Sequence, residues 1–326
     1  MYFLLNILFI GVSVLYMATE ARIVDGHRKY IYWFFVITAS VLFAFRPNDT
    51  KDTIAYINGF LHSSDMSVEN VTLFQKYKGY EIGYIFLMRV FRFFSDSYRL
   101  FFFLVAFSGL SLTLYSLSRI TIAFDNEDAE LCEGLYIPSG RVLAIYIATY
   151  GFLYHGITVR AGLSIGLMLF AITRIQDAKY IEAVFFVVLA FSVHRMSFLI
   201  LFGYLIQHYL PTIRQKTHIV IWTVLGFFMF SGIASMLFRH FVFWLNYAIT
   251  HLGISGYSAY LNSLDIGVGL SDVYKWLLYG FLIFVTDNRR IMEKNLKAVM
   301  VGAFIVVFMH DVRAVSRAYH MLLILL

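Results

Sequence analysis

Arginines, histidines and carboxylates stand at the ends of long apolar segments in this sequence. Arg160 opens one apolar run, and the polar pair His194 and Arg195 separates two others. Further side chains of these types at similar positions are Arg46, Asp49, Asp52, Glu81, His310, Asp311, Arg313 and Arg317. A guanidinium carries a fixed charge on a planar fork that binds phosphate through two hydrogen bonds, whereas a histidine or carboxylate can take a proton from a hydroxyl. Together these residue types suit a substrate that is a phosphate headgroup on a lipid tail.

Several of these residues also have a purely structural interpretation. Arginines at helix ends often only extend to lipid headgroups, which applies to Arg46, Arg160 or Arg317 taken alone. His194 could be a neutral histidine whose ring is satisfied by backbone groups at a tight turn. Arg160 stands out because its turn has no acidic neighbour, and an arginine that only sets topology belongs on the cytoplasmic side. Both interpretations stay open from the residues alone.

The composition indicates which elements must position these side chains. Of the 326 residues, 60% are hydrophobic, 19% are aromatic and 14% are charged, whereas soluble domains are about 45–50% apolar and about 25% charged. We therefore expect one integral membrane domain, residues 1–326, with an all-α fold of about 10–12 helices that are each near the length needed to span a bilayer. The apolar segments are 2–19, 30–45, 99–118, 141–155, 158–174, 180–193, 196–210, 218–238, 272–286, 298–309 and 314–326.

Basic residues in the short connectors predict the orientation of these helices. Eleven lie in the connectors 20–29, 174–179, 211–217 and 287–297, against three in the turns 155–158, 194–195 and 310–317. Since lysine and arginine favour the cytoplasmic side, we expect loops of about 46–98 and 239–271 on the outer side, with short interfacial helices in them. When the basic residues of every loop are counted, the two sides carry equal numbers, but basic residues in long loops contribute less to the orientation.

This orientation requires that segment 82–98 does not cross the bilayer. Arg89 and Arg92 lie inside its apolar stretch, and an arginine at the bilayer centre costs about 2.5–3.5 kcal/mol on insertion scales. We therefore expect an interfacial or re-entrant helix here. A complete crossing would reverse every later assignment.

Several classes of chemistry lack their sequence signatures. There is no GxxxxGK loop, HExxH, GxSxG or nucleotide fingerprint, so ATP-driven transport and membrane zinc proteolysis are disfavoured. Cys132 is the single cysteine, and the net charge of +6 forms no basic stripe, so neither a disulfide nor nucleic-acid binding is indicated. Asp49-x2-Asp52 could share a divalent ion with a pyrophosphate, but we expect no metal and no cofactor.

Five short motifs follow one another along nearly the whole chain. They are Arg46-x5-Asp52-Thr53-x2-Tyr56, Glu81-x-Gly83-Tyr84, Val159-Arg160-Ala161-Gly162-Leu163, Val193-His194-x2-Ser197 and Arg317-x-Tyr319. In their order and spacing the chain resembles the EpsG family of Wzy-type polysaccharide polymerases. It departs from the family pattern at two places. The usual glycine before Asp52 is replaced within Pro47-Asn48-Asp49-Thr50-Lys51, and the usual proline between Glu81 and Gly83 is Ile82.

The resemblance implies a bacterial enzyme of the inner membrane with its active site facing the periplasm. Such an enzyme transfers a growing glycan from undecaprenyl pyrophosphate to the non-reducing end of a lipid-linked repeat unit, without nucleotide sugar or metal. Its partners would be these lipid-linked oligosaccharides and membrane lipids, with a Wzz-type chain-length regulator as a further candidate. Three alternatives stay open: a ligase of the O-antigen type, a flippase or other transporter, and a scaffolding membrane protein.

Roles for the residues follow from the resemblance and from their chemistry. We expect Arg46, Arg160 and Arg317 to bind the pyrophosphate, and His194, Asp52 or Glu81 to act as the base. His194 ranks first because an unperturbed histidine, with a pKa near 6.5, is largely neutral at pH 7, and a Glu81 with a pKa raised by burial is its rival. Direct displacement would invert the anomeric centre, whereas a carboxylate nucleophile would retain it. Substrate contacts are expected from Tyr56, Tyr84, Arg195, Arg313 and Tyr319.

Overall fold

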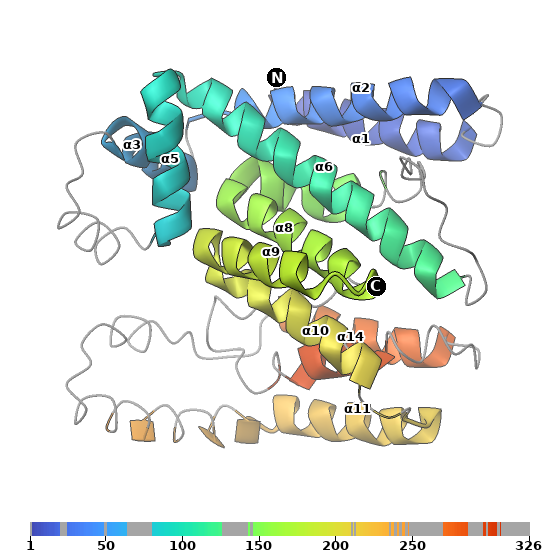
Figure 1. Cartoon of the computed structure of the whole chain (residues 1–326). Helices are drawn as coiled ribbons and strands as arrows, with labels where there is room; N and C mark the ends of the chain where they lie inside the picture. The colour runs from blue at the N-terminus through green and yellow to red at the C-terminus, as the bar shows by residue number, and fades with distance from the viewer. Residues whose placement is uncertain are drawn as a thin grey trace. The chain divides into compact units, whose positions relative to one another are not determined.

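The structure is a computed structural model (Figure 1). It describes residues 2–19, 25–48, 51–63, 80–125, 146–209, 213–234, 270–285 and 299–304, and the single residues 143, 211, 236, 237, 240, 243, 244, 247, 296, 297 and 307. All regular elements within these residues are helices, which confirms the predicted all-α class. The chain divides into two compact units, Met1–Phe198 and Leu199–Leu326, and each is described here by itself.

The first unit contains nine helical elements in the described residues. They are α1 (Tyr2–Thr19), α2 (Asp25–Ala44), α3 (Lys51–Leu61), α5 (Ile82–Phe94), α6 (Tyr98–Asp125), the π-helix η3 (Ile147–Ile157), α8 (Val159–Gln176), α9 (Tyr180–Val193) and the 3-10 turn η4 (Arg195–Ser197). The long helix α6 runs across α8, while α1 and α2 lie side by side (Figure 1). The loop predicted at 46–98 therefore contains two short helices, α3 and α5.

Among the residues that the structure describes, two helices are long and apolar enough to cross a membrane, Tyr98–Ile120 and Val159–Gln176. Shorter apolar helices lie at Tyr30–Ala44, Tyr180–Val193 and Val273–Phe284. The segments predicted at 2–19 and 180–193 coincide with α1 and α9. The spanning α-helix predicted over 141–155 is wrong in type, since the described residues from Ile147 to Ile157 form a π-helix. A full set of 10–12 spans stays a prediction.

Glycines bring α6 and α8 into close contact at the centre of the first unit. A Cβ atom on Gly109 would lie about 2.9 Å from the Cα of Leu163, and one on Gly166 about 2.5 Å from the carbonyl oxygen of Gly109. Small residues allow such close approach between membrane helices. Gly109 and Gly166 therefore allow α6 and α8 to pack backbone against backbone.

An ion-pair cluster joins α6, α8 and α9 at the end of the unit where α8 ends and α9 begins. Asp177 pairs with Arg119 at 3.0 Å and with Arg174 at 3.3 Å, and Arg174 also lies 3.6 Å from Glu182. These charges belong to the end that the basic connectors predict to be cytoplasmic. They connect the three helices at the end of the unit opposite to Arg160 and His194.

The second unit contains α10 from Leu199 onward (Phe198–Tyr209), α11 (Gln215–Phe230) and α14 (Leu270–Val285). The indole rings of Trp222 and Trp276 stack with centres 4.6 Å apart, and each ring N–H donates to the backbone carbonyl of the other residue at 3.0 Å. Cβ atoms on Gly226 and Gly280 would collide with these rings. The two glycines therefore make room for the indoles, which join α11 to α14 in antiparallel fashion.

Candidate active site

Functional candidates from distant parts of the sequence meet at one end of the first unit. Glu81 directly precedes α5, Arg160 lies in the first turn of α8, and His194 directly follows α9. Because α8 and α9 run antiparallel, the start of one lies beside the end of the other. Arg46 follows α2 at the same end. The four candidate residues therefore lie at helix ends that meet at one end of the unit.

Glu81 is the centre of this site. Its Oε2 accepts a hydrogen bond from Nη1 of Arg160 at 2.6 Å, and its Oε1 lies 3.1 Å from Nδ1 of His194. The backbone N–H of Arg195 also donates to Oε1 at 3.3 Å. The side chains of Glu81, His194 and Arg160 are 11%, 14% and 19% exposed. The carboxylate is thus largely shielded from water but paired on both oxygens.

The surroundings of Glu81 keep it ionised. Burial alone would raise the pKa of its carboxyl group, but the hydrogen bond with His194 and the positive charge of Arg160 outweigh burial and lower it. The expectation of a Glu81 with a raised pKa is therefore wrong, because its partners could not be read from the sequence. An ionised carboxylate only accepts hydrogen bonds, so the proton between the two side chains resides on Nδ1 of His194. The other ring nitrogen, Nε2, makes no hydrogen bond with any described residue.

Two serines, Ser164 and Ser197, bind the backbone at His194. Ser164 donates to the carbonyl oxygens of Ala190 at 2.9 Å and His194 at 3.1 Å, and Ser197 donates to the carbonyl of His194 at 2.8 Å. Ser197 is the last residue of the motif Val193-His194-x2-Ser197. Its role is to fix the turn in which the imidazole stands.

Three tyrosines form the wall beside Arg160. The ring of Tyr56 from α3 lies 5.8 Å from those of Tyr80 and Tyr84, and Tyr80 lies 6.0 Å from Tyr84. The Tyr56 hydroxyl hydrogen-bonds to the Arg160 guanidinium, which lies 5.2 Å from the centre of the Tyr80 ring. Burial raises the pKa of Tyr56 despite the nearby charge of Arg160, so its hydroxyl stays protonated. All three rings are almost fully buried, so they position Arg160 and have little surface for stacking on a sugar.

Tyr80 is the residue of this wall that sequence reasoning missed. Its signal was weak, since it is one aromatic residue in a chain with 23 tyrosines, although it directly precedes Glu81. A Cβ on Gly59 would lie 2.9 Å from the Tyr80 ring. Glycine at position 59 therefore lets the ring pack onto α3.

The contact between α5 and α9 explains why the motif Glu81-x-Gly83-Tyr84 has a glycine at position 83. A Cβ at this position would collide with the side chain and the backbone carbonyl carbon of Ser192 on α9. The absence of a side chain lets α5 contact α9, two residues after Glu81 and two residues before His194. The close approach of these two helices brings the carboxylate within reach of the imidazole.

Arg46 lies behind the tyrosines in a buried position. Its Nη1 donates to the carbonyl oxygen of Gly156 in the π-helix, and its guanidinium lies 4.5 Å from the centre of the Phe102 ring. Its charge acts on the hydroxyls of Tyr56 and Tyr84. In this conformation Arg46 connects the π-helix to the site and is 7% exposed.

The remaining predicted residues lie at the margin of the site or outside the described residues. Asp52 is half-buried in the first turn of α3, where its charge acts on Tyr56 and Tyr80. The side chain of Arg195 is exposed. Arg313, Arg317 and Tyr319 fall outside the described residues, as do Asp49, His310 and Asp311. Within the described ranges no three histidine, cysteine or carboxylate side chains converge as they would around a metal ion.

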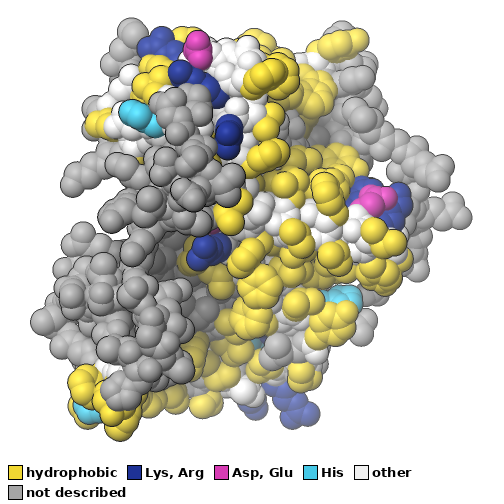
Figure 2. Space-filling view, turned by 60° about the vertical axis from the view of Figure 1, so that its left-hand side comes forward, with side chains coloured by type: hydrophobic (Ala, Val, Ile, Leu, Met, Phe, Trp, Pro, Cys, Tyr) yellow, Lys and Arg dark blue, Asp and Glu magenta, His cyan; other side chains and the backbone are white. Residues whose placement is uncertain are grey.

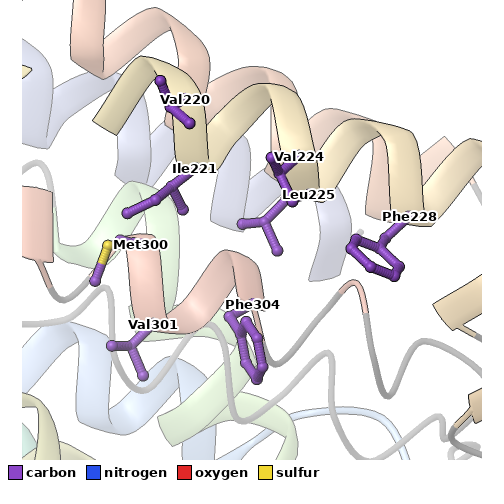
Figure 3. A pocket seen from close by; sticks show the side chains of 8 residues that line it. All are labelled: Val220, Ile221, Val224, Leu225, Phe228, Met300, Val301 and Phe304. Atoms are coloured by element: carbon purple, nitrogen blue, oxygen red, sulfur yellow. The ribbon is translucent and has the colours of Figure 1, made fainter. Parts of the chain in front are cut away.

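The second unit contains an apolar cavity of about 400 Å³ between α11 and the helical residues 300–304 (Figure 3). It is lined by Val220, Ile221, Val224, Leu225, Phe228, Met300, Val301 and Phe304. No acid, base or hydrogen-bonding side chain is among these residues. The cavity therefore has space for hydrocarbon but no group for catalysis.

Comparison with known proteins gives one match. The family model of the EpsG family covers residues 29–326, which includes all the elements that form the site. No curated protein and no solved structure matches the chain.

Proposed function

The chain belongs to the EpsG family, which is associated with Wzy-type polymerases, and from this premise we propose that it polymerises lipid-linked oligosaccharide repeat units. The donor is a growing glycan on undecaprenyl pyrophosphate, and the acceptor is the non-reducing-end hydroxyl of a new lipid-linked repeat unit. The observation that carries the proposal is the Glu81 carboxylate, which joins a histidine and an arginine at one helix-bundle end. A base and a phosphate-binding cation within one site are what glycosyl transfer from a pyrophosphate requires.

His194 is the general base in this proposal. With Nδ1 donating to Glu81, Nε2 accepts the proton of the acceptor hydroxyl, and the ionised Glu81 stabilises the imidazolium that forms. The histidine and the carboxylate have the same roles in the catalytic pairs of hydrolases. His194 later releases the proton to water.

Arg160 acts on the donor. The acceptor oxygen forms a bond with the anomeric carbon while the bond from that carbon to the pyrophosphate oxygen breaks, and the electron pair leaves with the pyrophosphate. Arg160, with Arg317 as a second cation, stabilises this negative charge. Arg46 fixes the π-helix that precedes α8 and so supports Arg160. A single displacement of this kind inverts the anomeric centre.

The position of the site supports a periplasmic reaction. The Glu81 cluster lies at the end of the first unit opposite to the basic connector 174–179 and the ion pairs of Asp177. The basic-residue bias of the connectors favours a cytoplasmic location for that opposite end. The site would then face the periplasm of a bacterial inner membrane, where repeat units arrive after translocation.

A deletion strain that carries plasmid-borne variants tests the function. We expect the glycan ladder on a gel to be lost with Arg160→Ala and His194→Ala, with a single repeat unit still attached to the lipid acceptor. The control is His62→Ala, an exposed histidine at the end of α3 whose Nδ1 lies 2.8 Å from the carbonyl oxygen of Asn58 on the same helix. Loss of all attached glycan would instead indicate a ligase or a flippase, and an unchanged ladder in the deletion strain would contradict the family-based function.

Binding and chemistry can be separated in the same strains. His194→Ala should still bind donor lipid, because the arginines remain, whereas Arg160→Ala should bind it weakly. Photo-crosslinking with a lipid pyrophosphate probe measures this difference. If both variants made glycan of normal length, the residue roles would be wrong even if the family function holds.

A further inference from the structure

The short helix α5 has an exposed apolar face. Ile82, Phe86 and Phe93 are 61%, 64% and 86% exposed, and their spacing of four and seven residues places them on one side of an α-helix. Tyr84, Ile85 and Met88 are buried against the first unit. The part of the first unit that carries α3 and α5 comes forward in Figure 2, where basic side chains stand among hydrophobic ones in the upper part of the view. The apolar face of α5 is therefore turned away from the protein interior.

The length and the charges of α5 together disfavour a complete crossing of the bilayer. Its 13 residues rise about 20 Å against roughly 30 Å of hydrocarbon, and it carries Arg89 and Arg92, whereas α9, of similar length, contains no basic residue. Only residues 95–97 separate it from α6, whose portion Tyr98–Ile120 is long and apolar enough to span. The C-terminal end of α5 therefore lies at about the same depth in the bilayer as the start of that helix.

The charge of Arg89 indicates whether lipid or protein covers this apolar face. It is exposed, lies between Phe86 and Phe93 on the same side of the helix, and forms no ion pair with a described residue. A second copy of the chain that covered the face would have to bury this unpaired guanidinium, which is costly. Lipid phosphates supply the complementary charge directly above the acyl chains, and arginine side chains extend to them from apolar surroundings.

We propose that α5 lies in the boundary layer of the bilayer, with Ile82, Phe86 and Phe93 among the acyl chains and Arg89 on lipid phosphates. Amphipathic helices in this layer bury their apolar face about 5–10 Å deep. Glu81 immediately precedes α5, so the lipid sets the depth of the carboxylate and keeps it at the level of phosphate groups. The inference concerns placement in the membrane and does not depend on the proposed reaction.

Site-directed spin labelling tests this placement without any activity measurement. In a Cys132→Ser chain, nitroxide labels at Phe86→Cys and, separately, at Phe93→Cys are measured in phosphatidylcholine–phosphatidylglycerol nanodiscs. We expect higher collision rates with oxygen than with Ni(II)EDDA at both positions, as at the lipid control Val184→Cys on the exposed side of α9. Lys179→Cys, in the exposed turn between α8 and α9, provides the opposite pattern.

Two results would overturn the proposal. Dominant collisions with Ni(II)EDDA at both positions would place α5 in water, and low rates with both reagents would show that protein covers it. The two labels sit on one helix, so a single variant that fails to fold still leaves the other as a test. The contribution of the Arg89 charge to this placement is measured by adding Arg89→Glu to the Phe93→Cys chain. This change should shift the depth of the label by several ångströms relative to the lipid phosphates.

Discussion

His194 and Glu81 share a hydrogen bond of 3.1 Å between Nδ1 and Oε1 although 113 residues separate them in the chain. The bond exists because α5 and α9 meet at Gly83 and Ser192. It gives the imidazole a defined orientation and leaves Nε2 for the substrate.

Glu81→Gln should lower polymerisation in vitro by about 10³-fold, within the range of general-base contributions. The amide keeps the shape of the side chain, but it cannot stabilise the imidazolium and weakens the preference for a proton on Nδ1. Initial rates with purified protein and lipid-linked repeat units provide the measurement. Glu182→Gln, at the opposite end of the first unit, is the matched control and should be near wild type. A Glu81→Gln rate above a tenth of wild type would argue against the dyad.

Arg160→Ala should destabilise the protein as well as inactivate it. The substitution leaves the Glu81 carboxylate largely buried without its 2.6 Å partner, and breaking a buried pair costs about 3–5 kcal/mol, reduced here to roughly 1–3 because the pair is partly exposed. The double variant Arg160→Ala/Glu81→Gln should regain much of the lost thermal stability without regaining activity. Melting curves in detergent test this. Equal melting temperatures for the single and double variants would contradict the coupling.

The stability of the protein should fall in acid through Glu81. Its pKa is lowered in the folded state from an ordinary value of 4.5, so its stabilising contribution is fully present above that pH and is lost as the pH falls through the lower folded pKa. The melting temperature difference between wild type and Glu81→Gln should therefore shrink below about pH 4.5. A difference that is constant from pH 7 to pH 3 would show that ionisation of Glu81 contributes nothing.

Gly83→Ala should separate α5 from α9. The added methyl group collides with Ser192 on both side chain and backbone, so the helices must move apart and the bond between Glu81 and His194 lengthens. We expect activity to fall about 10- to 100-fold, since small displacements at a catalytic pair have effects of this size. Gly11→Ala is the control, because no atom lies within 4 Å of its added Cβ. Wild-type activity for Gly83→Ala would mean that the contact is not required.

The sequence predicted the helices better than the contacts between them. Apolar length and polar interruptions determine where a membrane helix begins and ends, which is why 2–19 and 180–193 coincide with α1 and α9. The same argument could not distinguish the π-helix from an α-helix over 147–157, because the two differ in hydrogen bonding and not in composition. The residues on the helix ends were therefore predictable, whereas the local geometry before Arg160 was not.

The pairing of the charged side chains could not be predicted from the sequence. Arg160 has no acidic neighbour in the chain, and its partner Glu81 lies 79 residues earlier. Whether burial or pairing controls the pKa of Glu81 depends on this three-dimensional partner, so the expected direction of the shift was wrong. Tyr80 was missed for the same reason, since its contact with the Arg160 guanidinium leaves no mark in residue spacing.

The tryptophan pair of the second unit makes that unit observable by its own chromophores. Trp222 and Trp276 are two of four tryptophans, and their rings are 4.6 Å apart with planes inclined by 8°. Indoles this close couple their electronic transitions, so circular dichroism should contain a contribution that exists only while α11 and α14 are docked. Trp276→Phe would remove this contribution. The difference between the wild-type and variant spectra could then report the assembly of this helix pair in a bilayer without any added label.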